Sequence, residues 1–256
     1  MNYFNPESAA ARYAKGRPDF HDNTIAQVKD FLQLTRSINK ALDIACGTGL
    51  STKALLTIAE HVYGTDTSEH MLNNAVKNDA IRYRLAAAEQ QPFDNKIFDL
   101  ITVCSGVHWF NIDAFLNEAN RLLKDDAWLI LYDNFFIADM ELTDGFKDWY
   151  LTTYLEKYPA PKRNESYDWS NENLQHKQFA LVHESNFTNA VDFTKSELVL
   201  YFTTQSNVIA TVESGNTTYN EVEEWLHKEL SAFFTHNDTC KTIHYGNWIK
   251  YIQKTN

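Results

Sequence analysis

The stretch that most constrains this chain is an apolar run that ends in a glycine-rich turn. Residues 41–45 (Ala-Leu-Asp-Ile-Ala) are short and mostly apolar, which is typical of a buried strand. Cys46-Gly47-Thr48-Gly49 follows, and residues 50–59 are predicted to form a helix. A strand, a glycine turn and a helix in this order bring backbone N–H groups and a helix N-terminus towards a ligand. We therefore expect a nucleoside cofactor to lie across this turn.

Strand-like and helix-like segments alternate through the first half of the chain. Further strands are predicted at 61–66, 81–86, 98–103 and 128–132, and helices at 8–14 (capped by Ser8), 24–34, 112–123 and after Thr67-Ser68. This alternation predicts a parallel sheet with helices on both faces. Right-handed crossovers then place the ligand crevice at the carboxyl ends of the strands.

The alternation stops after residue 133. Residues 134–185 are rich in Trp, Tyr, Phe and Lys, and they are predicted to form an inserted helical cap. Strands at 190–193 and 241–253 and helices at 195–203 and 219–234 are predicted beyond it. The expected fold class is therefore α/β, a Rossmann-like seven-stranded, mostly parallel sheet with a cap after strand five. Residues 1–256 are expected to be a single domain, and residues 1–24 either a lid segment or an ordinary N-terminal arm.

Composition excludes several classes of protein. The net charge of -11 and the pI of about 5.2 argue against a general nucleic-acid binder, which needs a basic surface. The three cysteines have no metal-ligand spacing, so we expect no metal and a reducing compartment. No apolar run approaches the length of a membrane span, and residues 1–6 do not resemble a signal peptide. A cytoplasmic monomer or homodimer with no membrane partner is expected.

An acidic residue after the second strand adds weight to the glycine turn. Asp66 lies 17 residues after Gly49, where a carboxylate can accept hydrogen bonds from both hydroxyls of a ribose. The alternative is that Asp66 only caps the following helix. Residues 47–52 lack the third glycine of a dinucleotide-binding turn, which counts against a nicotinamide cofactor.

Three motifs in order resemble class I S-adenosylmethionine-dependent methyltransferases. Residues 42–49 (Leu-Asp-Ile-Ala-Cys-Gly-Thr-Gly) resemble their first motif, and Gly64-Thr65-Asp66-Thr67-Ser68 with Met71-Leu72 resembles the second. Residues 87–93 with 98–100 resemble the "Ala-Glu-x-x-Pro-Phe … Phe-Asp" pattern of the type 11 subgroup. The resemblance covers residues 8–133. Ala45 stands where the family often has glycine, which implies slightly looser packing.

The resemblance implies a role for each matching residue. Asp43 would orient the turn and reach the amino acid end of S-adenosylmethionine, and Asp66 would bind its ribose. Ser105 would face the sulfonium. The remaining cofactor contacts would come from the backbone of Ala45, Gly47 and Gly49, from Thr67 and Met71 beside the adenine, and from Ala88 and Glu89 at its edge. Arg12-Tyr13 and Arg17-Pro18 resemble a lid motif, so Tyr13 and Arg17 are also expected to contact the cofactor, with Arg17 or Arg12 pairing its carboxylate.

The acceptor is less constrained than the methyl donor. Residues 105–110 lack the Asn/Asp-Pro-Pro-Tyr motif of enzymes that methylate base or amide nitrogens, and His108-Trp109-Phe110 resembles the trans-aconitate methyltransferase-like branch. His108 either acts as a base or orients the acceptor, or it is a structural histidine. Trp109, Trp149 and Gln205 are further candidates for acceptor contacts, and the pair Lys162-Arg163 could attract an anion. An aromatic cluster could roof the pocket or form the core of the cap: Trp149, Tyr150, Tyr154, Tyr158, Tyr167 and Trp169.

The predicted activity follows from these motifs. We expect an enzyme that transfers the methyl group of S-adenosylmethionine to a small molecule by in-line displacement. An oxygen nucleophile is favoured, with a carboxylate among the candidates, since a carboxylate needs no base. Two alternatives stay open: a non-catalytic module that binds S-adenosylmethionine, and a nicotinamide-dependent dehydrogenase.

Overall fold

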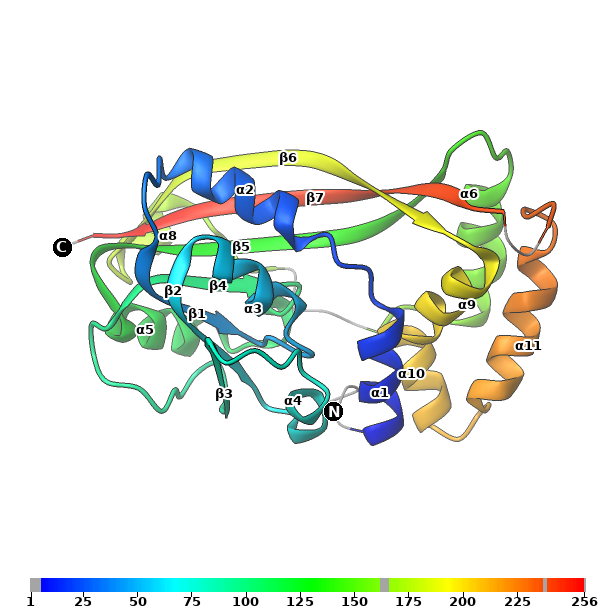
Figure 1. Cartoon of the computed structure of the whole chain (residues 1–256), viewed down its shortest axis with the longest axis horizontal. Helices are drawn as coiled ribbons and strands as arrows, with labels where there is room; N and C mark the ends of the chain where they lie inside the picture. The colour runs from blue at the N-terminus through cyan, green and yellow to red at the C-terminus, as the bar shows by residue number, and fades with distance from the viewer. Residues whose placement is uncertain (1–5, 162–165, 237–238, 256) are drawn as a thin grey trace. The chain divides into compact units, whose positions relative to one another are not determined.

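A seven-stranded sheet organises the chain in the order β3-β2-β1-β4-β5-β7-β6 (Figure 1). The computed structural model describes residues 6–161, 166–236 and 239–255. The strands are β1 (Ile38–Ile44), β2 (Ala59–Asp66), β3 (Ile81–Leu85), β4 (Phe98–Cys104), β5 (Leu123–Met140), β6 (Phe179–Phe193) and β7 (Lys241–Lys254). The longer helices are α1 (Glu7–Gly16), α2 (His21–Phe31), α5 (Ile112–Leu122), α9 (Lys195–Thr203), α10 (Ser206–Glu213) and α11 (Tyr219–Leu230). The shorter helices are α3 (Leu50–Ala54), α4 (Glu69–Asn73), α6 (Phe146–Trp149), α7 (Leu155–Lys157) and α8 (Asn171–Gln175).

Most strand pairs in the sheet are parallel. β1 pairs with β2 and with β4, β2 pairs with β3, and β4 pairs with β5, all in parallel. β7 runs against β5, because Glu141 N–H donates to Thr242 O while Lys254 Nζ reaches Leu123 O. The predicted Rossmann-like α/β class is therefore confirmed, including the seven strands.

The chain divides into two compact units. Unit 1 comprises Met1–Pro18, Phe135–Lys162 and Thr188–Gly246, and unit 2 comprises Asp19–Asn134, Arg163–Phe187 and Asn247–Asn256. Each of the strands β5, β6 and β7 contributes residues to both units.

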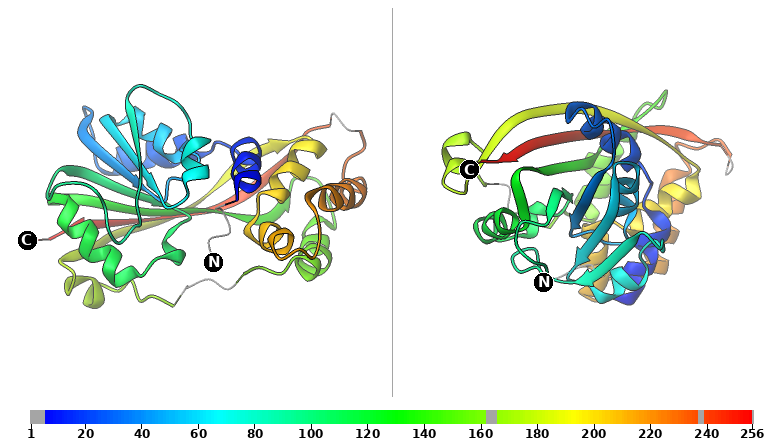
Figure 2. Two further views of the ribbon diagram at one scale, coloured as in Figure 1. Left: turned by 90° about the horizontal axis from the view of Figure 1, so that it is seen from below. Right: turned by 60° about the vertical axis from the view of Figure 1, so that its left-hand side comes forward.

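Unit 2 has an apolar core on each face of its sheet. Alternate residues of a strand point to opposite faces. Leu42 and Ile44 accordingly pack with α5 through Phe115, while Ala41 shares a cluster with Val28 of α2 and Ala54 of α3. Helices on both faces thus bury the strands, and the carboxyl ends of β1, β2 and β4 stay at one edge (Figure 2).

Unit 1 is built from α1, α6, α7, α9, α10 and α11 with the strand ends. Aromatic side chains fill its interior, and Tyr154 and Phe202 are fully buried with ring centroids 4.6 Å apart. Of the predicted aromatic cluster, Trp149, Tyr150, Tyr154 and Tyr158 belong to this unit, whereas Tyr167 and Trp169 pack against the core of unit 2. The cluster is therefore two separate groups.

Several predicted boundaries are wrong. α1 begins at Glu7, and its N-cap is Pro6, so Ser8 does not cap it. α3 is only five residues long, and the short 3-10 helix Leu55–Thr57 follows it. The predicted helical cap at 134–185 is wrong at both ends, because β5 runs on to Met140 and β6 begins at Phe179. Helices α6, α7 and α8 lie between them.

Some expectations lie outside what the structure describes or tests. Lys162 and Arg163, and the first five residues of the lid segment, are not among the described residues. Within the described part of the chain, no helix is both long enough and apolar enough to cross a membrane. The cytoplasmic location and the oligomeric state stay predictions.

Candidate cofactor site

The strand order reverses between β1 and β4, which is where open α/β sheets form their ligand crevice. Ala45 follows β1 directly and Ser105 follows β4 directly, and both have positive φ angles, of 57° and 52°. A left-handed conformation costs a non-glycine residue about 1–2 kcal/mol, and such strain gathers at functional sites. These two residues mark the centre of the candidate site.

Ala45 packs tightly against the end of β4. A Cβ placed on Gly106 would lie 2.9 Å from the Cβ of Ala45 and 3.3 Å from Val103 Cγ1. The slightly looser packing expected from alanine at this position stays a prediction. Gly106 leaves the space that the Ala45 methyl group occupies.

Gly49, the last glycine of the turn, is explained by a tyrosine from β3. Gly47 and Gly49 have φ angles of 53° and 78°, which favour glycine. A Cβ on Gly49 would lie 2.2 Å from the hydroxyl oxygen of Tyr83, which donates to Val76 O at 3.0 Å. Burial raises the pKa of Tyr83, so this hydroxyl stays protonated. Sequence reasoning missed Tyr83, because nothing in a single strand residue signals its contact with a turn 34 positions earlier.

Three backbone N–H groups of the turn are already bonded within the protein. Cys46 N–H donates to Thr65 O, Gly47 N–H to Asp66 Oδ2 and Gly49 N–H to Cys46 O, each at 2.9 Å. The expectation that these groups point at a ligand is therefore wrong for these three. A phosphate cradle needs several such donors, so the turn suits a ligand without phosphates.

Asp43 connects the end of β1 to α3 and to β4 through hydrogen bonds of its side chain. Its carboxylate is fully buried and accepts hydrogen bonds from Ser51 Oγ at 2.6 Å, Thr52 Oγ1 at 2.7 Å and Thr102 Oγ1 at 2.9 Å. Burial raises the pKa of Asp43 to about 6, although the three hydroxyl donors lower it. This arrangement fits the predicted role in orienting the turn. Its contact with the amino acid end of a cofactor stays a prediction.

Asp66 joins the glycine turn to the start of α4. Its carboxylate accepts from Gly47 N–H at 2.9 Å and from Ser68 N–H at 2.8 Å. Burial raises the pKa of Asp66, while the backbone donors oppose the shift. The helix cap itself is Ser68, whose Oγ accepts from Met71 N–H at 3.2 Å. Thr67 is exposed and Met71 is buried.

The loop that carries Ala88 and Glu89 is fixed by α5. Ala88 is buried in the unit 2 core, and Glu89 Oε1 accepts from Asn111 N–H at 2.8 Å. Glu118 accepts from Gln91 N–H at 2.7 Å and pairs with Arg121. The loop therefore has a defined conformation beside the strand ends.

Ser105, directly after β4, and Asp133 of β5 lie next to each other beside the crevice. Ser105 N–H donates to Tyr132 O at 3.0 Å, and Ser105 Oγ donates a hydrogen bond to Asp133 Oδ1. His108 and Trp109 follow in the 3-10 helix η2 (Val107–Trp109), with ring centroids 4.7 Å apart. Asp133 was not predicted from the sequence, although an acidic residue directly after the predicted strand 128–132 is a usable signal.

The other predicted site residues lie in unit 1. Arg17 Nη2 donates to Thr204 O at 3.1 Å, and its guanidinium carbon lies 4.6 Å from the centre of the Tyr13 ring. Gln205 follows Thr204 as the N-cap of α10. The structure thus brings Tyr13, Arg17 and Gln205 into one neighbourhood.

Trp149 also lies in unit 1, where it is only 9% exposed. Its Nε1 donates to Glu229 Oε2 at 3.2 Å, and its ring stacks near Phe146. This burial favours a core role for Trp149 over an acceptor contact.

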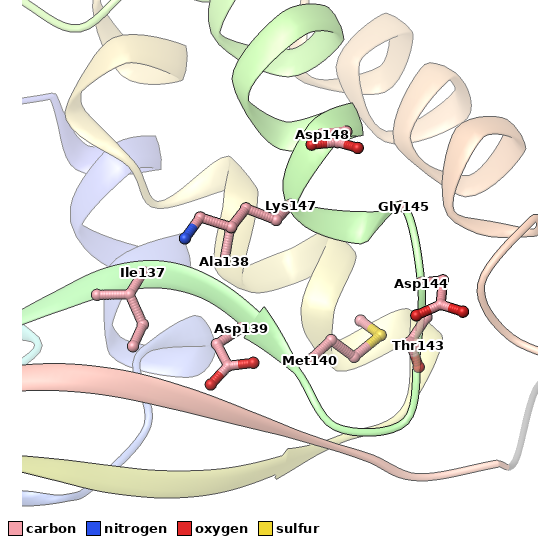
Figure 3. A pocket seen from close by; sticks show the side chains of 9 residues that line it. All are labelled: Ile137, Ala138, Asp139, Met140, Thr143, Asp144, Gly145, Lys147 and Asp148. Carbon is pink, nitrogen blue, oxygen red and sulfur yellow. The ribbon is translucent and has the colours of Figure 1, made fainter.

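A pocket of about 450 Å³ lies within unit 1 and contains none of the motif residues (Figure 3). Its lining includes Asp139, Asp144, Lys147 and Asp148. Among the described residues, no group of three or more His, Cys, Asp or Glu side chains is arranged to hold a metal ion.

Comparisons with known proteins agree with this geometry. Residues 42–131 match the family model described as a methyltransferase domain. A Dictyostelium discoideum protein assigned as a methyltransferase is 28% identical over 92% of this chain and 89% of its own length.

Solved structures share the fold. One assigned as a type II methyltransferase from Anaeromyxobacter dehalogenans has a TM-score of 0.72 at 17% identity, covering 92% of this chain and 97% of its own. Phosphoethanolamine N-methyltransferase 2 of Haemonchus contortus, solved with S-adenosyl-L-methionine, has a TM-score of 0.52 at 15% identity, covering 99% of this chain and 58% of its own.

The donor set of the site fits S-adenosylmethionine. The turn does not present the N–H groups of Cys46, Gly47 and Gly49 to a phosphate, and Asp66 supplies a half-buried carboxylate suited to ribose hydroxyls. This cofactor carries a ribose and no phosphate, and it supplies an electrophilic methyl group on a sulfonium. Residues 42–131 match a methyltransferase domain, and this match, the similarity to the Dictyostelium discoideum protein and the shared fold indicate an S-adenosylmethionine-dependent methyltransferase.

Proposed function

We propose that the protein methylates an oxygen atom of a small molecule and that a carboxylate is the acceptor group. The observation that carries this proposal is the segment after β4. Ser105 turns the backbone out of the strand at positive φ, and η2 then presents a half-buried His108 beside Trp109, which is 40% exposed. An imidazole next to an aromatic face suits a small planar acceptor better than a nucleic acid, and the net charge of -11 also disfavours a polyanion.

The cofactor contacts belong to the same proposal. Asp66 would bind the ribose, and Thr67, Met71, Ala88 and Glu89 would surround the adenine. Asp43, with the backbone of Ala45, Gly47 and Gly49, would shape the rest of the site, and Ser105 would face the sulfonium. Tyr13, Arg17 and Gln205 stay predictions for a lid and an acceptor contact, as does the place in the trans-aconitate methyltransferase-like branch.

Little proton chemistry is needed for a carboxylate acceptor. Its oxygen is already deprotonated at neutral pH, so alignment and exclusion of water provide most of the acceleration. On this view His108 orients the acceptor through a hydrogen bond and does not act as a base. Replacing it with Asn should then lower kcat less than about tenfold, whereas loss of a general base costs about 100-fold or more.

The test is transfer of a labelled methyl group to a panel of small carboxylic acids, alcohols, phenols and amines, with a protein and an RNA sample for comparison. We expect label in the carboxylic acids, in a form that mild alkali releases as methanol. Methyl ethers and methylamines resist this treatment. Label that alkali does not release would overturn the carboxylate acceptor, and binding without turnover of any compound would favour a non-catalytic module.

A further inference from the structure

Asp133 lies at the candidate site without a role in the motifs. β4 and β5 are parallel neighbours with Cys104 opposite Tyr132, so Ser105, directly after β4, comes next to Asp133, the following residue of β5. Ser105 is the residue at positive φ beside the crevice, and a Cβ on the next residue, Gly106, would lie 2.9 Å from the Cβ of Ala45 in the glycine turn. The carboxylate of Asp133 is therefore hydrogen-bonded to Ser105, one of the two residues at the centre of the site.

The hydrogen bond between the two side chains holds Ser105 in its strained conformation. Ser105 Oγ donates to Asp133 Oδ1, and Ser105 N–H donates to Tyr132 O at 3.0 Å. Two bonds to β5 thus fix the residue that we expect to face the sulfonium. A hydrogen bond to a charged acceptor is stronger than a neutral one.

The negative charge of Asp133 reaches its surroundings. The pKa of Cys104 is raised first by burial and next by the charge of Asp133. Opposite charges attract over several ångströms when water is partly excluded. The same field therefore acts on any cation that lies against Ser105.

Methyl transfer changes the charge of the cofactor. The acceptor oxygen forms a bond to the methyl carbon, and the electron pair of the breaking S–C bond stays on sulfur. The sulfonium cation becomes a neutral thioether, while an anionic acceptor becomes a neutral ester. A fixed negative charge beside the sulfur thus attracts the substrate form of the cofactor and not its product form.

We propose that Asp133 is a positioning residue which fixes Ser105 and makes the site prefer cationic S-adenosylmethionine to neutral S-adenosylhomocysteine. This inference rests on the proposed cofactor site at the ends of β1 and β4, and it concerns the methyl donor alone. Its consequence is that the attraction to Asp133 disappears once the methyl group has left, so the spent cofactor is released more readily.

The test is isothermal titration of the full chain with three ligands: S-adenosylmethionine, S-adenosylhomocysteine, and sinefungin, in which a protonated amine replaces the sulfonium. We expect Asp133→Asn to weaken binding of the two cations about tenfold and of S-adenosylhomocysteine less than twofold. Asp133→Glu restores the charge and should recover most of the preference. Asp139→Asn removes an exposed charge further along β5 and should change none of the three affinities.

Two results would overturn the proposal. Asp133→Asn could weaken all three ligands equally, which would make its role purely structural, or it could change none of them. A loss of folding would appear in the thermal transition, and Asp133→Glu would then have to keep the cation preference of the native chain for the proposal to stand. If the native chain binds none of the three ligands, the cofactor site itself is wrong, and this inference falls with it.

Discussion

The buried carboxylate of Asp43 gives the protein a pH response of its own. Its pKa is about 6 in the folded chain and 3.8 in an ordinary setting. Below about pH 4 the Asp43 carboxyl is protonated in both the folded and the unfolded chain, and the folded chain then has its full stability with respect to this group. Between about pH 4 and 6 the folded state keeps a proton that the unfolded chain has released, so the free energy of unfolding falls as pH rises. The loss from this group approaches about 3 kcal/mol above pH 6.

Asp43→Asn isolates this response. Urea unfolding of both chains should show that the native chain loses up to about 3 kcal/mol relative to Asp43→Asn between pH 4 and pH 7. The side-chain amide oxygen in this variant can still accept a hydrogen bond from a neighbouring hydroxyl, so we expect Asp43→Asn to fold. Parallel pH curves for the two chains would contradict the raised pKa.

Asp66 carries the sharpest prediction about the cofactor. Its two oxygens already accept from Gly47 and Ser68, and a carboxylate has about four acceptor positions, which leaves room for a ribose diol. Asp66→Ala should weaken binding of S-adenosylhomocysteine by about 1–3 kcal/mol, as measured by titration calorimetry. Glu69→Gln removes an exposed charge from the same helix start and should leave the affinity unchanged. An unchanged affinity in Asp66→Ala would exclude the ribose contact.

At the level of whole elements, the methyl group of Ala45, after β1, lies close to Gly106, after β4. Gly106 has an ordinary φ of -112°, so its backbone conformation does not require glycine. The nearest obstacle to a side chain at Gly106 is the Cβ of Ala45, at 2.9 Å. Gly106→Ala should destabilise the chain by about 1–3 kcal/mol, because it overpacks this contact.

The double variant tests this fit. In the Ala45→Gly background the cost of Gly106→Ala should fall by at least about 1 kcal/mol, because the opposing methyl group is gone. Urea unfolding of the four chains gives the coupling energy. Additive effects would mean that Val103, the next nearest neighbour of Gly106, sets the cost instead.

Helices and strands with a clear pattern of apolar residues were predictable from the sequence, whereas most of the edge strand β6 was not. β1 and β4 are buried runs that end in recognisable turns, and α5 has an apolar face, so their bounds agree within a few residues. β6 is the last strand in the order, and most of its residues are partly or fully exposed. Because neither face of β6 is well buried, its sequence lacks the alternation of apolar and polar residues that marks a strand. Only its last four residues were therefore predicted as a strand.

At the scale of the whole molecule, the sequence could not show which residues share a compact unit. The motif residues from Asp43 to Ser105 all lie in unit 2, as their order along the chain suggests. Unit 1 instead gathers three distant stretches, including the N-terminal helix and residues 188–246. No local pattern encodes such long-range contacts, so Arg17 beside Thr204 or Arg12 beside Glu223 could not be foreseen.

The contacts of α1 make a final prediction about the lid. Arg12 pairs with Glu223 and lies 4.2 Å from the centre of the Tyr219 ring, and a Cβ on Gly16 would lie 2.9 Å from Leu200 O. These contacts fix α1 to α9 and α11, so its amides should exchange hydrogen as slowly as those of α9.

Hydrogen exchange followed by mass spectrometry measures this directly. Arg12→Ala removes the ion pair and should speed exchange in α1, while Lys15→Ala, an exposed residue of the same helix, should not. If α1 also serves as a lid, adding S-adenosylhomocysteine should slow its exchange further. Exchange of α1 at the rate of an unstructured chain would contradict its place in unit 1. Protection that the ligand leaves unchanged would retain α1 as a structural helix and exclude the lid, because a segment that closes over a bound ligand must gain protection from it.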